Sequence, residues 1–287
     1  MEQQETHAKA KWAQTLGVSK SGYYAWVETR EERQERDQMR EKKVLEIFEE
    51  SEGHYGAERI CGVIRKDGGH ASFGVVKGIM ERHKLKSSHC RRRQRSLTDS
   101  RKARDDRYEN LTNDVTIERP FQVLSSDITY IRTGEGFDYL CQIRDVHTNT
   151  VLAQCQQERM TKELVTRTMQ SAKRRWNIPK GCILHSDRGS QYTSKAAQEL
   201  AAQYGWKQSF SRIGKPGDNA WSESFFSILK KEIIHWHFYP TREAARQQVF
   251  EYIEIYYNRQ RKQKRLGYLS PIEFLTIWMD QHLQTVA

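Results

Sequence analysis

Membrane-spanning and secretory segments are missing from this sequence. It contains no run of 18 or more apolar residues, which excludes a transmembrane helix. The first residues, Met-Glu-Gln-Gln-Glu-Thr-His, lack the basic and then apolar pattern of a signal peptide. We therefore expect a cytoplasmic protein that has no membrane partner.

Cysteine is scarce and scattered. The cysteine count is five, an odd number, and no two cysteines form a Cys-x-x-Cys pair. Such spacing argues against a disulfide framework and against a structural zinc site, and it fits a reducing compartment. The residues concerned are Cys61, Cys90, Cys141, Cys155 and Cys182.

Positive charge is in clear excess. The 287 residues include 48 Lys and Arg against 37 Asp and Glu, which gives a formal net charge of +11 and a pI of about 9.4. This balance favours a polyanionic partner. Composition alone leaves DNA, RNA and an anionic membrane surface open.

The first third of the chain is predicted to be helical. Residues 9–27 fit either a compressed helix-turn-helix or an ordinary helical hairpin, and the mixed charges of 28–43 fit a solvated helix. Residues 44–85 fit three short helices, with a glycine turn at 67–70 and Ser72 as the cap of the last helix. This pattern is typical of a helix-turn-helix, whose final helix enters the DNA major groove, although many three-helix units bind protein instead. Lys77 on that helix is a predicted DNA contact.

Two basic clusters lie on either side of residues 108–258. Residues 86–107 carry nine cations against three anions and have little to pack, which predicts a linker that contacts phosphates. A second cluster at 259–265 has no acid among its residues. The predicted nucleic-acid contacts in the two clusters are Arg91, Arg92, Arg93, Arg259 and Arg261.

After Pro120 the pattern changes to α/β. Strand-like segments at 121–130, 139–145 and 150–156 precede alternating helices and strands, which indicates an α/β domain with a mixed sheet. Further strands are predicted at 181–185 and 206–210, and helices at 162–176, 195–204, 241–257 and 271–283.

Three carboxylates occupy unusual places in this α/β part. Asp127 lies inside an apolar strand, where a charge is costly unless it is paired or metal-bound. Asp187 follows the end of a buried strand, where open α/β sheets place their ligands. Glu223 lies near the start of a helix, shares a helix face with Lys230 seven residues on, and follows Asp218 and Asn219, either of which can cap that helix.

Singly, each of these acids has an ordinary structural explanation. Together they predict a site for a hard cation, because three carboxylates brought close repel one another unless a cation neutralises them. Mg²⁺ prefers oxygen ligands, and two such ions about 4 Å apart can support an in-line phosphoryl displacement. We therefore predict that Asp127, Asp187 and Glu223 are both catalytic residues and metal ligands.

Three motifs carry a resemblance to a known family. They are Leu-His-Ser-Asp-Arg-Gly-Ser-Gln-Tyr-Thr-Ser at 184–194, Asp-Asn-Ala-x-x-Glu-Ser-Phe-Phe at 218–226, and Tyr-Asn-Arg followed by Leu-Gly-Tyr-Leu-Ser-Pro within 257–271. Together with the 35 residues between Asp187 and Glu223, they resemble the integrase-core (DDE) transposases of bacterial insertion sequences. The second-frame product of the insertion-sequence-three family is the most similar type, and the resemblance covers almost the whole chain.

The resemblance implies a fold and an activity. The fold is α/β, with a ribonuclease-H-like, retroviral-integrase-like catalytic core behind N-terminal helix-turn-helix-like all-α modules. The activity is DNA cleavage at the element ends followed by attack of the freed 3′-hydroxyl on another phosphodiester, with two Mg²⁺ or Mn²⁺ ions held by the three acids. Asn219 and Lys230 would lie at the DNA, with Arg188 as a further contact and His185 as a support.

The resemblance also implies partners and a domain order. The partners are duplex DNA at the element ends and target, a homo-oligomer on that DNA, and the upstream-frame product as a fusion, in a bacterial cytoplasm at the nucleoid. Two departures from the family are Leu124, where many relatives carry Trp, and the segment 259–265, where a His often precedes Leu-Gly. The expected segments are an N-terminal helical segment at 1–43, a DNA-binding module at 44–98, a basic linker at 99–118 and the catalytic core at 119–287.

Two alternatives to a transposase remain open at this point. One is a non-catalytic DNA-binding regulator of transposition, and the other is a metal-dependent nuclease that acts on RNA–DNA hybrids. The two helical modules and the two basic clusters favour duplex DNA as the substrate.

Overall fold

The computed structural model describes residues 15, 17–90, 109–113, 115–212 and 219–283. The chain divides into two compact units, 1–87 and 88–287, and each is described by itself. Within these described ranges, no helix has both the length and the apolar character needed to cross a membrane.

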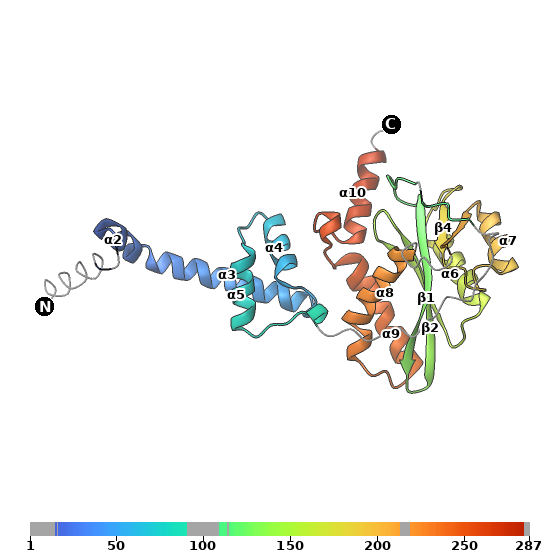
Figure 1. Ribbon diagram of the computed structural model, residues 1–287, viewed down its shortest axis with the longest axis horizontal. Helices are drawn as coiled ribbons and strands as arrows, with labels where there is room; N and C mark the ends of the chain where they lie inside the picture. The colour runs from blue at the N-terminus through green and yellow to red at the C-terminus, as the bar shows by residue number, and fades with distance from the viewer. Residues whose placement is uncertain (1–14, 16, 91–108, 114, 213–218, 284–287) are drawn as a thin grey trace. The chain divides into compact units, whose positions relative to one another are not determined.

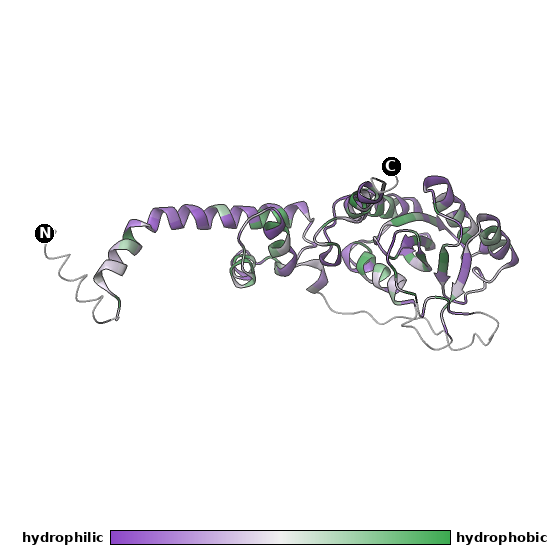
Figure 2. Cartoon of the chain, turned by 90° about the horizontal axis from the view of Figure 1, so that it is seen from above, coloured by the Kyte–Doolittle hydropathy of each residue, from purple (hydrophilic) through white to green (hydrophobic). Residues whose placement is uncertain are grey.

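The first unit begins with two consecutive helices. Helix α2 (Lys20–Glu28) is capped by Ser19, whose hydroxyl accepts a bond from the Gly22 N–H at 3.1 Å. Helix α3 (Arg30–Glu50) is largely exposed up to residue 43, and Figure 2 shows this stretch as predominantly hydrophilic. The solvated helix expected at 28–43 is therefore confirmed. The helix expected before α2 lies mostly outside the described residues.

A three-helix core follows. The end of α3 packs with α4 (Ala57–Lys66) and α5 (Phe73–Arg82). The turn between α4 and α5 contains Gly68 at φ +80°, and the Ser72 hydroxyl accepts a bond from the Val75 N–H at 3.3 Å, as predicted. The helix-turn-helix-like prediction is confirmed. The buried side chains of this three-helix core include Val44, Ile47, Ile60, Ile64, Val76 and Ile79.

The second unit contains one five-stranded mixed sheet. Its strands are β1 (Val123–Thr133), β2 (Gly136–Asp145), β3 (Val151–Gln157), β4 (Ile183–Ser186) and β5 (Lys207–Phe210). The order is β3-β2-β1-β4-β5, antiparallel from β3 to β1 and parallel from β1 to β5. All five predicted strands are present, which confirms the α/β core.

Helices cover both faces of this sheet (Figure 1). On one face lie α6 (Lys162–Arg175) and α7 (Lys195–Tyr204), and on the other lie α8 (Ala220–Glu232) and α9 (Arg242–Glu251). The helix of α9 continues as a π-helix, Tyr252–Tyr257, and α10 (Pro271–Leu283) ends the described chain. Each face has its own hydrophobic core, as expected for a ribonuclease-H-like fold.

Part of the predicted linker is attached to the sheet. The Phe210 N–H donates to the Glu109 carbonyl at 2.9 Å, and the Leu111 N–H donates to the Ser209 hydroxyl at 2.9 Å. The segment at 109–112 therefore extends the β5 edge of the core. The basic residues 91–108 lie outside the described residues.

A buried carboxylate at the end of α8 joins four segments. Glu232 and Arg261 are each 2% exposed, and the Glu232 carboxylate pairs with the Arg261 guanidinium at 2.7 Å. The Tyr252 hydroxyl donates to the same carboxylate at 2.6 Å, and the His89 imidazole, in the short helix Ser88–Cys90, lies at 2.6 Å. Because a buried charge is tolerated only when it is well paired, these contacts fix the end of α8.

We predict that Glu232→Gln lowers the free energy of unfolding by roughly 3 kcal/mol, because it leaves the Arg261 charge buried and unpaired. Urea denaturation of the full chain measures this. The matched control is Glu273→Gln, whose partner Lys262 at 2.6 Å is partly exposed, and which should cost less than about 1 kcal/mol. Equal costs for the two variants would contradict the structural role of Glu232.

Candidate active site

The pairing of β1 with β4 places two of the three acids side by side. The parallel register joins Val123 to Ile183 and Ser125 to His185, so paired residues are sixty positions apart. Asp127 and Asp187 have the same separation: Asp127 lies within β1, two positions after the last pair, and Asp187 directly follows the end of β4. Because side chains alternate along a strand, Asp127 belongs to the face that carries Ser125 and His185. The charge of Asp187 acts on the Asp127 carboxyl, so the loop after β4 keeps Asp187 near that face.

This face of the sheet is the one covered by α8. The His185 ring lies edge-on to the Trp221 ring in the first turn of α8, with centroids 5.9 Å apart. Leu124 and Leu184 alternate to the opposite face and belong to the core under α6 and α7. Glu223 is exposed in the same first turn of α8. The helix thus brings the third acid to the sheet face of the other two.

The charges of these groups act on one another at Asp127. Burial, helped by the negative charges of Asp187 and Glu223, raises the pKa of Asp127 to about 7. A bond from the Ile128 N–H at 2.8 Å and the Lys230 ammonium oppose this increase. At neutral pH the Asp127 carboxylate is therefore held at an electrostatic cost that a nearby cation would relieve.

Asp187 shows a related effect. Its residue surface is exposed, yet the surrounding protein withdraws enough water from the carboxyl that burial raises its pKa. The Gly189 N–H donates to its Oδ1 at 3.0 Å and opposes the shift. The loop after β4 thereby fixes the direction of the carboxylate without neutralising it.

The donor chemistry of this site fits a hard divalent cation, because its acids offer carboxylate oxygens only. The arrangement of the acids in space, however, is not that of a complete ligand set. Among the residues that the structure describes, no three His, Cys, Asp or Glu side chains form a group that could hold a metal ion. The acids therefore share a face and an electrostatic field without forming a closed set of ligands.

Lys230 lies beside this acidic site on α8. It is half-buried, and its ammonium lies 5.5 Å from the centroid of the Tyr130 ring, within the range of a cation–π contact. Burial lowers the pKa of Lys230, and the charge of Asp127 opposes that change. This lysine is therefore part of the site's electrostatics.

His185 and Arg188 are anchored to β5 and to the residue that follows it. The His185 ring nitrogens lie 2.9 Å from the Ser209 hydroxyl and 3.2 Å from the Ser211 hydroxyl, and the residue is fully buried. Arg188 Nε donates to the Ser211 carbonyl at 2.8 Å. Both side chains thereby brace the loop that carries Asp187.

Asn219 differs from the prediction. It occupies the cap position of α8, but its side chain accepts no bond from the helix N–H groups. Its Oδ1 is instead buried and has no hydrogen-bond partner among the residues that the structure describes. The other predicted cap, Asp218, lies outside the described residues.

Comparison with known proteins identifies the family. The Integrase core domain model matches residues 117–216 and 223–277, and the HTH-like domain model matches 34–94. The chain is 35% identical over 269 residues to "Transposase InsF for insertion sequence IS3A" of Escherichia coli (strain K12), covering 90% of this chain and 91% of that protein. The chain belongs to the insertion-sequence transposases with an integrase core domain.

Two further matches accompany this one. The transposase is 37% identical over 266 residues to "Insertion element IS600 uncharacterized 31 kDa protein" of Shigella sonnei, covering 91% of this chain and 96% of that protein. Among solved structures, the catalytic core domain of BIV integrase matches with a TM-score of 0.40 and 17% identity, covering 58% of this chain and 99% of that one.

The remaining predicted DNA contacts of the transposase are placed as follows. Lys77 is exposed on α5, 3.6 Å from Glu81, and Arg259 is exposed after the π-helix. Arg261 needs a correction: its guanidinium is buried against Glu232, so it belongs to the interior and is withdrawn from the set of DNA contacts. The other three predicted contacts, Arg91, Arg92 and Arg93, lie outside the described residues.

Sequence reasoning missed two polar residues beside the acids. Gln142 and Arg144 lie on β2, at 0% and 4% exposure, opposite Asp127 and Ser125 of β1. The signal that could have found them is their spacing, since these two long polar side chains lie two positions apart and alternate with the apolar Cys141 and Ile143.

We predict that Asp127→Asn stabilises the transposase at high pH. The folded-state pKa of Asp127 is about 7, against about 3.9 in an unfolded chain, so the native carboxylate lowers stability increasingly as the pH rises from 4 to 7. Without divalent ions, the variant should gain on the order of a few kcal/mol in unfolding free energy at pH 8, and that gain should vanish near pH 4. Urea denaturation across this pH range measures the gain.

The control is Asp280→Asn, at an exposed position of α10, which should show no such trend. A gain in Asp127→Asn that does not depend on pH would contradict the electrostatic account.

Proposed function

We propose that this transposase cuts DNA at the ends of its insertion sequence and joins the freed 3′-hydroxyl to another phosphodiester. The observation that supports the proposal is the β1–β4 register, whose last pair, Ser125 with His185, lies two positions before Asp127 and Asp187 on the face covered by the first turn of α8. The electrostatic effect of Asp187 and Glu223 on Asp127 supports the same site.

Asp127, Asp187 and Glu223 would hold Mg²⁺ or Mn²⁺, with two ions as the expected number. Bound divalent ions would stabilise the negative charge on the attacking and leaving oxygens of an in-line phosphoryl displacement. Asp127 gives up its proton near neutral pH, so it is available as a ligand at that pH. Lys230 and Arg188 would contact the DNA next to the acids, whereas the buried side chain of Asn219 is withdrawn from the set of DNA contacts.

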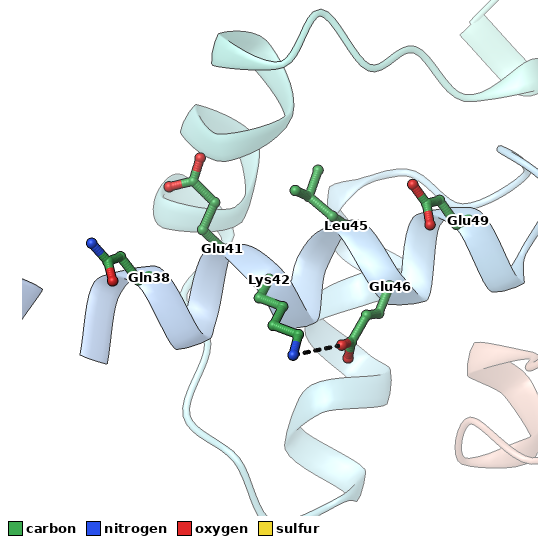
Figure 3. A pocket seen from close by; sticks show the side chains of 6 residues that line it. All are labelled: Gln38, Glu41, Lys42, Leu45, Glu46 and Glu49. Atoms are coloured by element: carbon green, nitrogen blue, oxygen red, sulfur yellow. Dashed lines mark ion pairs between the residues drawn. The ribbon is translucent and has the colours of Figure 1, made fainter. Parts of the chain in front are cut away.

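The first unit would bind duplex DNA through α5. This helix is the last of the helix-turn-helix-like core, and it exposes Phe73, Val75 and Lys77. A face of α3 is unsuited to that role: Figure 3 shows Glu41, Glu46 and Glu49 along it, and such acids repel phosphates. We infer that α5 enters the major groove, where Lys77 meets the DNA.

The basic residues Arg91, Arg92, Arg93 and Arg259 would add phosphate contacts, which give affinity and salt dependence without sequence choice. Joining two element ends requires two copies of the active site, so we propose a homo-oligomer on DNA in the bacterial cytoplasm, at the nucleoid. The upstream-frame product, fused to this chain, is the proposed partner in end recognition.

One observation favours a second function. Because the described acids do not form a closed set of metal ligands, the chain by itself could occupy element ends as a DNA-binding regulator. An assay that separates binding from cutting distinguishes the two functions. An RNA–DNA hybrid offered as a competing substrate tests the related nuclease.

The central variant is Glu223→Gln, which keeps the shape of the side chain and removes its charge. On a labelled duplex carrying the element end, with Mg²⁺, we expect nicking and strand joining to fall at least about 100-fold, since several kcal/mol of charge stabilisation are lost. Binding of the same duplex should be unchanged. The control is Glu199→Gln, an exposed acid on α7 that pairs with Lys195 at 3.6 Å, and it should keep full activity.

If wild type and both variants bind the duplex but none cuts it, the chain alone is a regulator, and the fused upstream-frame product becomes the candidate enzyme. If Glu223→Gln cuts as fast as wild type, the assignment of the three acids is wrong. Faster cutting of the RNA–DNA hybrid than of the duplex would favour the nuclease.

A further inference from the structure

Two buried polar side chains of β2 lie beneath the first turn of α8. In the antiparallel register, Gln142 is the partner of Asp127, and Arg144 is the partner of Ser125. Cross-strand partners project from the same face, so both side chains point to the side of the sheet that α8 covers. They are 0% and 4% exposed.

Both side chains contact the two residues that precede Glu223. Gln142 Nε2 donates to the Ser222 hydroxyl at 3.4 Å, and Arg144 Nη2 donates to the Trp221 carbonyl at 2.5 Å. The Arg144 guanidinium also lies 5.9 Å from the centroid of the Phe225 ring, one turn further along α8. The start of α8 is therefore held to the sheet by these contacts.

Stability does not account for this polar layer. Within the described part of the chain, four buried polar atoms have no hydrogen-bond partner: Gln142 Oε1, Arg144 Nε, Ser125 Oγ and Asn219 Oδ1. A buried polar atom left unpaired costs roughly 1–3 kcal/mol, and apolar side chains at these positions would avoid that cost. Such groups in a native structure call for a functional explanation.

We propose that Gln142 and Arg144 are positioning residues that set the distance of Glu223 from Asp127, and thereby the affinity of the site for divalent cations. Gln142 links the strand of Asp127 to the helix of Glu223: it is the cross-strand partner of Asp127, and its side chain bonds Ser222, the residue before Glu223. Arg144 holds the adjacent carbonyl, so the two contacts together fix both the height and the rotation of the first turn. The inference rests on the proposed metal-dependent function.

The test compares Gln142→Met and Arg144→Met with Arg144→Lys, which keeps a donor for the Trp221 carbonyl. The matched control is Gln156→Met on β3, because Gln156 also has a buried, unpartnered Oε1 but bonds Asp138 at 2.9 Å, away from α8. Mn²⁺ is titrated into each full chain bound to the element-end duplex, and binding is followed by water-proton relaxation. Thermal melting and duplex affinity without metal are measured in parallel.

We expect the Mn²⁺ concentration at half-saturation to rise roughly tenfold or more in both Met variants, the usual effect of removing a group that orients a metal ligand. Arg144→Lys should recover part of the affinity. Duplex affinity without metal should stay at the wild-type value, and Gln156→Met should bind Mn²⁺ as wild type does. If Arg144→Met does not fold, Gln142→Met and Arg144→Lys carry the same comparison.

Unchanged Mn²⁺ binding in folded Gln142→Met and Arg144 variants would overturn the inference, and so would an equal loss in Gln156→Met, which would indicate general destabilisation. These outcomes are distinct from a failure of the proposed function. If the proposed function itself fails, the wild-type chain will neither bind Mn²⁺ on the duplex nor cut the duplex, and the positioning role will be rejected together with the proposed function.

Discussion

The burial of the Asp127 carboxyl beside the negative charges of Asp187 and Glu223 is the constraint on which the rest of the site depends. In the parallel register of β1 and β4, both residues lie two positions after the Ser125–His185 pair, and the buried surroundings of Asp127 strengthen the effect of the Asp187 charge on it. Glu223 adds a third negative charge from α8, and Lys230 only partly offsets it. A fold that keeps such a cluster lowers its own stability at neutral pH, and a bound cation would relieve that cost.

Helix α8 is the element that turns this constraint into a working site. Its first turn lies over the polar layer of β2, and its last residue, Glu232, is tied to Arg261, Tyr252 and His89. A helix fixed at both ends keeps Glu223 and Lys230 at set positions over the sheet. The same Glu232 contacts join the C-terminal segments and the short helix at 88–90 to the catalytic core.

The sequence allowed most elements and the three acids to be predicted, because the relevant signals are local. Asp127 interrupts an apolar strand, Asp187 follows one, and Glu223 opens a helix. The sequence shows that the two aspartates are sixty residues apart. That separation matches the register of paired residues only because β1 pairs with β4, which the sequence does not reveal. Strand order depends on long-range packing, which no local pattern encodes.

The errors have the same origin. Arg261 was counted with its basic neighbours, since a run of charges does not reveal which side chain turns inward to meet Glu232, 29 residues earlier. Asn219 has the right residue type for a helix cap, yet tertiary contacts bury its side chain instead. Gln142 and Arg144 were passed over because their importance lies in what they touch across the sheet.

The most direct test of the central claim is the titration of Asp127 by ¹³C NMR of aspartate-labelled protein, with and without Mg²⁺ and with Asp127→Asn to assign the signal. The account predicts a carboxyl pKa near 7 in the absence of divalent ions, and a decrease of about one unit or more when Mg²⁺ is added. A pKa near 4 that does not respond to Mg²⁺ would contradict it, because the three acids would then not form one cation-demanding site.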